Sequence, residues 1–175
     1  MPDGILIIDK PSDWTSMDVC AKLRGIFHEK RIGHGGTLDP MATGVLPVFI
    51  GRATRAVEFA EKSDKEYVAS LRLGQVTDTQ DSTGTVLEEH PVPAAPAAAV
   101  AALLPHFTGT IDQIPPMYSA IKIHGQKLYQ LARKGREVER PARQITIREL
   151  ELLEPAPTGD LRLRIRCSKG TYVRT

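Results

Sequence analysis

The segment GHGGTLDPMATG, residues 33–44, has the residue types and spacing best suited to chemistry in this chain. It contains four glycines and a single carboxylate, Asp39, which stands directly before Pro40. Glycine allows left-handed and crowded backbone conformations, and a proline disfavours the helical conformation of the residue before it. The segment therefore predicts a tight, rigid loop that presents one acid, an arrangement typical of an active site.

Other kinds of site do not match this loop. Leu38 occupies the third glycine position of a GxGxxG motif, and no Gly-Lys-Ser/Thr follows as in a P-loop. No spacing suggests a Ser-His-Asp triad, and the loop lacks the second acid that a glycosidase needs. Cys20 and Cys167 are far apart and lie in apolar patterns. They predict buried thiols in a reducing cytosol, and without a cluster of ligands they do not predict a zinc site.

The composition, 41% hydrophobic and 25% charged residues in a chain of 175, is typical of one globular domain. The N-terminus lacks the basic region of a signal peptide, and no apolar run is long enough to span a membrane, so we expect a cytoplasmic protein. Residues 118–143 carry seven basic and two acidic side chains. This concentration of positive charge indicates a polyanionic partner, although it fits a solvated charged helix equally well.

The elements that position the loop are predicted by hydrophobic periodicity. Residues 4–9 form a short buried strand, and a helix capped by Thr15 or Ser16 follows. The apolar face of that helix consists of Val19, Leu23, Ile26 and Phe27. After the loop, residues 45–50 form a strand. Pro47 interrupts it, which indicates an edge strand or an irregular one.

Further strands follow along the chain. A helix over residues 53–61 precedes a strand over residues 66–73, in which apolar and polar side chains alternate. Residues 144–153 form a strand whose phase shifts near Glu149, which predicts a bulge. Residues 161–167, LRLRIRC, form a strand with arginines on its outer face. The fold class is therefore mixed α/β.

Five blocks of the sequence, in order, resemble the bacterial tRNA pseudouridine-55 synthases of the TruB family. They are DGILIIDKPSDWTSMDV, KRIGHGGTLDPMATGVLPVFIGRATR, KEYVASLRLGQVTDTQDSTG, QIPPMYSAIKIHGQKLYQLARKGREVERPAR and CSKGTYVRT. The resemblance implies the pseudouridine synthase catalytic fold over residues 1–175, an α+β fold with a mixed, largely antiparallel sheet and flanking helices. It also implies an RNA-binding insertion at about residues 112–143. One departure is Gly35, where the family often has threonine.

The chain ends in YVRT without a terminating signal. Members of the family continue with further catalytic-domain elements and usually with a small C-terminal RNA-binding domain. We therefore expect a catalytic domain that is C-terminally incomplete and lacks that second domain.

The resemblance implies that the protein converts uridine-55 in the TΨC loop of tRNA into pseudouridine. The N1–C1′ bond breaks, the uracil turns, and C5 bonds to the sugar, without a metal or cofactor. Asp39 matches the family's catalytic carboxylate, which attacks the sugar or begins its deprotonation. Arg174 matches the arginine that pairs with this carboxylate. Tyr67 matches the tyrosine that packs on the uracil, whereas the residues alone favour a core tyrosine.

The resemblance also implies a set of RNA-binding residues. His34 matches a position that stacks in the space vacated by the flipped base, and Tyr172 matches a substrate contact. Lys10 and Lys169 contact phosphate or order the loops, and a surface lysine is the alternative for each. The basic side chains that hold the RNA backbone are Lys122, Lys127, Arg133 and Lys134.

Two other functions stay open from the sequence. A binding module would grip and refold tRNA, with Asp39 incidental, but binding alone has no use for an acid–arginine pair. A nucleosidase acting on free nucleosides would have no use for the basic insertion. We expect a monomer that binds the T-arm of tRNA, with no protein partner.

Overall fold

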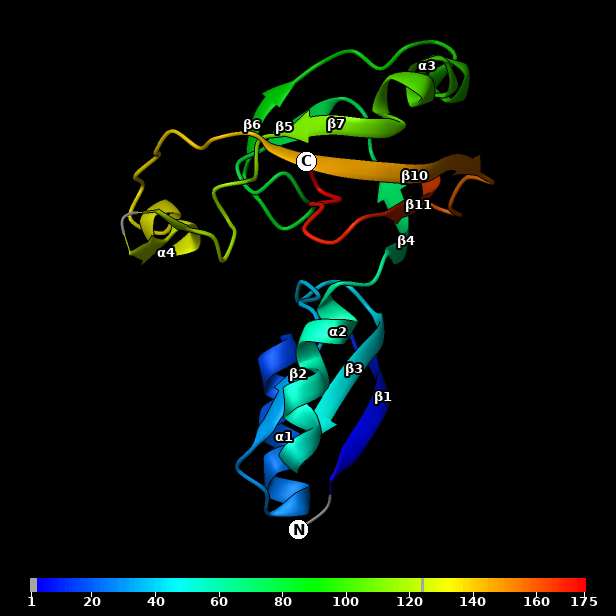
Figure 1. Ribbon diagram of the computed structural model, residues 1–175. Coiled ribbons are helices and arrows are strands. Elements are labelled where there is room, and N and C mark those ends of the chain that lie inside the picture. The colour runs from blue at the N-terminus through cyan, green and yellow to red at the C-terminus, as the bar shows by residue number, and fades with distance from the viewer. Residues whose placement is uncertain (1–2, 124) are drawn as a thin grey trace. The chain divides into compact units, whose positions relative to one another are not determined.

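A computed structural model describes residues 3–123 and 125–175 of the chain (Figure 1). The chain divides into two compact units, Met1–Ser63 and Asp64–Thr175. Each unit has its own antiparallel sheet and its own cluster of buried apolar side chains. The predicted α/β fold with antiparallel sheets is confirmed, while the single catalytic domain stays a prediction. Within the described residues, no helix has the length and apolarity needed to cross a membrane.

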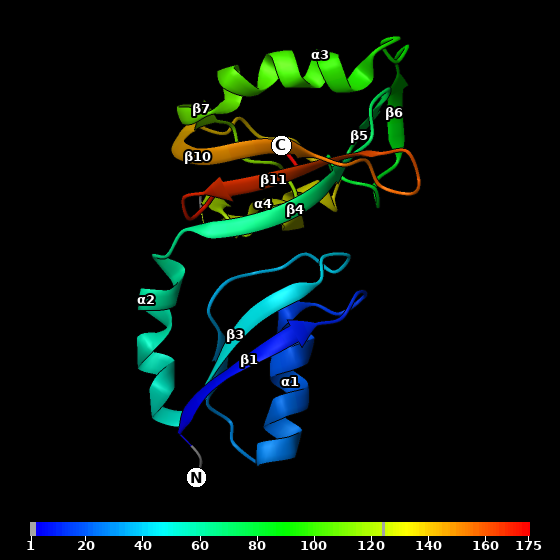
Figure 2. The same cartoon turned by 90° about the vertical axis from the view of Figure 1, so that its right-hand side faces the viewer.

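The first unit consists of a three-stranded sheet and the helix α1, which lies along one face of it (Figure 2). Its elements are β1 (Gly4–Lys10), α1 (Ser16–Phe27), β2 (Ile32–His34), β3 (Gly44–Ile50), the 3₁₀ helix η1 (Gly51–Ala56) and α2 (Val57–Glu61). The strand order is β1-β3-β2. Thr15 caps α1, as predicted: its Oγ1 accepts a hydrogen bond from the Asp18 N–H at 3.0 Å. The Asp18 carboxylate accepts one from the Thr15 N–H at 2.8 Å, which completes a capping box.

Three predictions for this unit are wrong. The strand over residues 4–9 is not buried on both faces, because the side chains of Ile5 and Ile7 are 54% and 65% exposed. Ile26 does not belong to the buried face of α1, because its side chain is 57% exposed. The predicted edge strand is the central one, since β3 pairs with both β1 and β2. Pro47 is tolerated in this central strand because β2 ends opposite Val48, so no residue of β2 faces Pro47. On that side the Pro47 carbonyl accepts a hydrogen bond from the Gly35 N–H at 2.8 Å. The missing N–H of Pro47 points to that same side, so the ladder with β1 loses no bond.

The second unit is built on a four-stranded antiparallel sheet of order β4-β11-β10-β7. Its elements are β4 (Lys65–Leu71), β5 (Gln75–Thr77), β6 (Val86–Glu89), α3 (Pro96–Leu103), the 3₁₀ helix η2 (Leu104–Phe107), β7 (Gly109–Gln113), β8 (Lys122–Ile123), β9 (Gln126–Lys127), α4 (Leu128–Ala132), β10 (Arg143–Leu153) and β11 (Leu161–Cys167). The register of β10 against β11 shifts between Ile147 and Glu149, which confirms the predicted bulge. Cys167 is fully buried, as expected.

The predicted insertion lies between β7 and β10 and has a small core of its own. It contains the short β8–β9 pair and α4, whose Leu128 and Leu131 are buried. The other described residues between β7 and β10 lie in no helix or strand, and the basic side chains of the insertion are mostly exposed. Because two leucines bury little apolar surface, the insertion has little intrinsic stability and depends on the strands at its ends.

Candidate functional site

The loop that carries Asp39 joins β2 to β3 and is held by backbone hydrogen bonds at several points. The Ala42 N–H donates to the Asp39 carbonyl at 3.0 Å, which closes a turn around Pro40. The hydroxyl of Ser16, a buried residue at the start of α1, accepts a bond from the Leu38 N–H at 3.0 Å and donates to the Leu38 carbonyl at 3.3 Å. The Ser16 hydroxyl therefore holds both the N–H and the carbonyl of Leu38, the residue directly before Asp39.

Lys10 fixes the other side of the same loop. Its side chain is fully buried, and its ammonium donates to the carbonyls of Pro11 at 2.8 Å, Trp14 at 2.6 Å and Pro40 at 3.2 Å. An ammonium has three hydrogens, and these three carbonyls accept them all. Of the two functional roles predicted for Lys10, the contacts support ordering of the loops. The surface-lysine alternative is wrong for this residue.

His34 and Gly35 lie at the entry to the loop. His34 is the last residue of β2 and pairs with Val48. A Cβ added to Gly35 would lie 2.8 Å from Cε2 of Phe49 and 3.0 Å from the Cβ of Ala60. Phe49 is only 3% exposed, so its ring has no room to withdraw. The Phe49 ring therefore fills the space that a side chain at position 35, such as the expected threonine, would occupy.

Arg174 forms an ion pair with Asp81, a residue that the sequence analysis did not select. The Arg174 Nη1 lies 3.3 Å from Oδ2 of Asp81, and the two side chains are only 12% and 8% exposed. The Asp81 carboxylate also accepts bonds from the Thr83 N–H at 2.9 Å, the Thr83 hydroxyl at 2.6 Å and the Thr79 hydroxyl at 2.8 Å. Burial raises the pKa of Asp81, but the bonds from Thr83 and Thr79 and the charge of Arg174 outweigh it, so the pKa is lowered.

A signal for Asp81 existed in the sequence. It is the second of the two acids in TDTQDSTG, residues 77–84, and threonine hydroxyls two residues to each side of it can bond a carboxylate. Asp39 belongs to the other unit, so its pairing with Arg174 stays a prediction. Within residues 3–123 and 125–175, no three His, Cys, Asp or Glu side chains gather as a metal site requires.

The ion pair gives the protein a testable dependence on pH. Because the pKa of Asp81 is lowered in the folded state, its contribution to stability is complete above the unfolded value near 3.8 and is lost as the pH falls through the folded value. We expect Asp81→Asn to lower the free energy of unfolding by about 2 kcal/mol at neutral pH, and by progressively less as the pH falls below 3.8 and through the folded pKa of Asp81. Urea titrations of both proteins across this range measure the difference. A constant difference would contradict the assignment.

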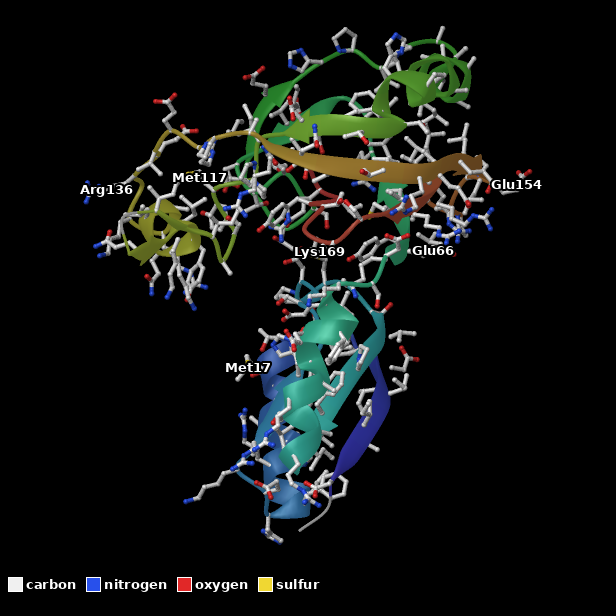
Figure 3. All side chains as sticks on the ribbon, in the orientation of Figure 1. Met17, Glu66, Met117, Arg136, Glu154 and Lys169 are labelled. Carbon is white, nitrogen blue, oxygen red and sulfur yellow. The ribbon has the colours of Figure 1, made fainter. Side chains whose placement is uncertain are left out.

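Tyr67, Tyr172 and Lys169 lie in the same unit as Arg174. Tyr67 is on β4 opposite Ile165 of β11, and its half-buried side chain packs against the apolar cluster of the sheet. The core-tyrosine reading is therefore confirmed, and the predicted contact with uracil stays a prediction. Lys169 is exposed in the segment after β11 (Figure 3). Tyr172 is half-buried in that segment, three residues further on.

Two of the four basic residues predicted to hold RNA lie beside one tyrosine in the insertion. The Nζ of Lys127 lies 5.5 Å from the centre of the Tyr129 ring, and the guanidinium carbon of Arg133 lies 5.4 Å from it. Lys122, Arg133 and Lys134 are exposed. A ring beside two cations, with further charges around it, forms a surface suited to a phosphate backbone with unstacked bases.

Comparisons with known proteins give the chain a family. The model of the TruB family pseudouridylate synthase (N terminal domain) matches residues 24–173. The tRNA pseudouridine synthase B of Heliobacterium mobile is 51% identical over 176 residues, which cover 99% of this chain and 57% of that protein. The tRNA pseudouridine synthase B of Opitutus terrae is 52% identical over 174 residues, which cover 99% of this chain and 71% of that protein.

Comparisons with solved structures find similar chains. The chain is similar to one in a Cbf5-Nop10-Gar1 complex, with a TM-score of 0.70 and 31% identity over 97% of this chain and 41% of that chain. It is also similar to a chain of an H/ACA RNP bound to a substrate RNA containing 2′-deoxyuridine, with a TM-score of 0.63 and 27% identity over 97% of this chain and 39% of that chain. The chain spans little more than half the length of the Heliobacterium relative. It belongs to the TruB family of pseudouridylate synthases, whose N-terminal domain it matches.

Proposed function

We propose that the protein is a tRNA pseudouridine synthase that isomerises uridine-55 in the T-arm. The observation that carries the proposal is a single acid, Asp39, on a loop braced by the buried side chains of Ser16 and Lys10. The names of the relatives, tRNA pseudouridine synthase B, support tRNA as the substrate. A braced carboxylate is suited to attack on a sugar or to proton abstraction from it, because its position costs no reorganisation.

In the proposed reaction, Asp39 attacks the sugar or removes a proton from it, and the N1–C1′ bond breaks with its electrons moving to the uracil. The uracil turns, and C5 forms the new bond to C1′. This step displaces the Asp39 carboxylate where Asp39 had attacked the sugar, or is accompanied by return of the proton from Asp39 to the sugar where Asp39 had removed one. The proton that C5 then loses is balanced by the proton that N1 gains. We assign Arg174 to stabilise charge beside Asp39, and Asp81 fixes that guanidinium. Tyr67 packs on the flipped base, and His34 fills the space that the base leaves.

The insertion binds the RNA in this proposal. Lys122, Lys127, Arg133 and Lys134 contact the phosphates, and Tyr129 offers a ring on which a base can stack. Tyr172 and Lys169 contact the substrate near Arg174. The protein acts as a monomer in the cytoplasm, where tRNA is modified.

A pseudouridine assay tests the proposal. A T-arm stem-loop RNA is incubated with the 175-residue chain and with a chimera in which the C-terminal part of the Heliobacterium relative follows Thr175. Pseudouridine is detected by chemical labelling and primer extension. We expect product at position 55 only, and none in an RNA with cytidine there. If neither protein forms product although both bind the RNA, the protein is a binding module and the proposed activity is wrong.

A further inference from the structure

Gln113 makes an unusual contact with the backbone of the segment that carries Arg174. Its side-chain nitrogen donates to the Tyr172 carbonyl at 3.0 Å, and its side-chain oxygen accepts from the Tyr172 N–H at 2.9 Å. The amide thus bonds both polar groups of one backbone residue, as a neighbouring strand would. The Tyr172 N–H needs this partner, because β11 ends at Cys167 and the following residues belong to no strand or helix, whereas the Tyr172 carbonyl also accepts a hydrogen bond from the Thr175 N–H at 3.2 Å.

Glutamine is the residue type that this contact requires. The side chain must supply a donor and an acceptor side by side, which only the amides of glutamine and asparagine do. Asparagine is one methylene shorter and reaches less far. A glutamate would keep the acceptor but place an unpaired negative oxygen against the Tyr172 carbonyl.

The segment that Gln113 holds contains the proposed catalytic arginine. Arg174 lies two residues beyond Tyr172 and pairs with Asp81 at 3.3 Å. The hydroxyl of Thr175 donates to the side-chain oxygen of Gln80 at 2.8 Å. Gln113 therefore fixes the backbone on the N-terminal side of Arg174, while the ion pair fixes the end of its side chain.

Gln113 also stands where the RNA-binding insertion begins. It is the last residue of β7, paired with Arg143 of β10, and the irregular chain of the insertion starts at the next residue. One residue therefore joins the base of the insertion to the backbone beside Arg174. We propose that Gln113 is a positioning residue, which places Arg174 for the reaction and couples its position to the insertion that grips the RNA.

This inference rests on the proposed function. One of its two readouts, the amide exchange of Tyr172, is independent of that function. Gln113→Met keeps the length of the side chain and removes both polar atoms, whereas Gln113→Glu removes only the donor. Gln144→Met, at an exposed position near the start of β10, is the matched control. Amide hydrogen exchange of Tyr172 is followed by NMR, and kcat and KM are measured on the T-arm RNA.

We expect Gln113→Met to raise the exchange rate of the Tyr172 amide about 10-fold, since that amide loses its acceptor. It should lower kcat about 10-fold with little change in KM, because Arg174 is misplaced while the insertion still binds RNA. Gln113→Glu should leave the amide protected and lower kcat less. The control should change neither quantity.

Three results would overturn the inference. They are unchanged exchange at Tyr172, faster exchange with unchanged kcat, and a rise in KM that accounts for the whole loss. If the unmodified protein forms no pseudouridine, the proposed function fails instead, and the exchange rates still decide whether Gln113 holds the Arg174 segment.

Discussion

Asp39→Asn is expected to lower the rate of pseudouridine formation roughly 10³-fold or more, which is the scale of loss when a catalytic group is removed. The amide has nearly the shape of the carboxylate, but it is neutral and can neither attack the sugar nor accept its proton. The loop should keep its conformation, because Ser16 and Lys10 hold the backbones of Leu38 and Pro40 in the variant as in the original protein. Single-turnover assays on T-arm RNA measure the change.

A matched control separates chemistry from folding. Asp9→Asn makes the same change at an exposed position of β1 in the same unit. It should leave the rate unaltered, and both variants should bind RNA as the original protein does. Asp39→Asn with a rate within a few-fold of the original would exclude Asp39 as the catalytic carboxylate.

Lys10→Met is expected to lower the free energy of unfolding by about 3 kcal/mol, because it removes the charged donor that three backbone carbonyls bond. In a chain of this size, that loss corresponds to a decrease in Tm of about 10 °C. The change should also slow pseudouridine formation, since the Pro40 carbonyl beside Asp39 loses one of its donors. Thermal unfolding followed by circular dichroism measures the first effect.

The control for Lys10→Met is the same substitution at an exposed lysine. Lys22 lies on the exposed face of α1, and Lys22→Met removes a charge without removing such a bond. It should shift Tm by no more than about 2 °C, as is usual for surface substitutions. Equal stability of the two variants would show that the Lys10 contacts add nothing net, as happens when the cost of burying a charge cancels its bonds.

Local sequence signals predicted the elements of the fold well. The capping residue Thr15, the bulge before Glu149 and the alternation of β11 all depend on neighbours within a few residues, and all are confirmed. The same reasoning misplaced Pro47, because a sequence does not show on which side of a strand the missing N–H lies. It misplaced Ile26 because the width of the buried face depends on the sheet beneath the helix.

The candidate site was predicted only in part, for a related reason. Asp39 could be selected because its whole setting lies within twelve residues, 33–44. The partners that hold the site come from distant parts of the chain: Lys10 reaches Pro40, and Gln113 reaches Tyr172 across 59 residues. No periodicity records such contacts. They became visible only when the strands had been arranged in space.

The tight contact between Gly35 and Phe49 has a consequence for the history of this loop. A side chain at position 35 and a ring at position 49 exclude one another, since the added Cβ would lie 2.8 Å from the ring. A change from glycine to a larger residue at position 35 would therefore need a smaller residue at position 49, or a shift of the Phe49 ring and of Ala60. The two positions should vary together across related sequences, with a large side chain at one accompanied by a small residue at the other.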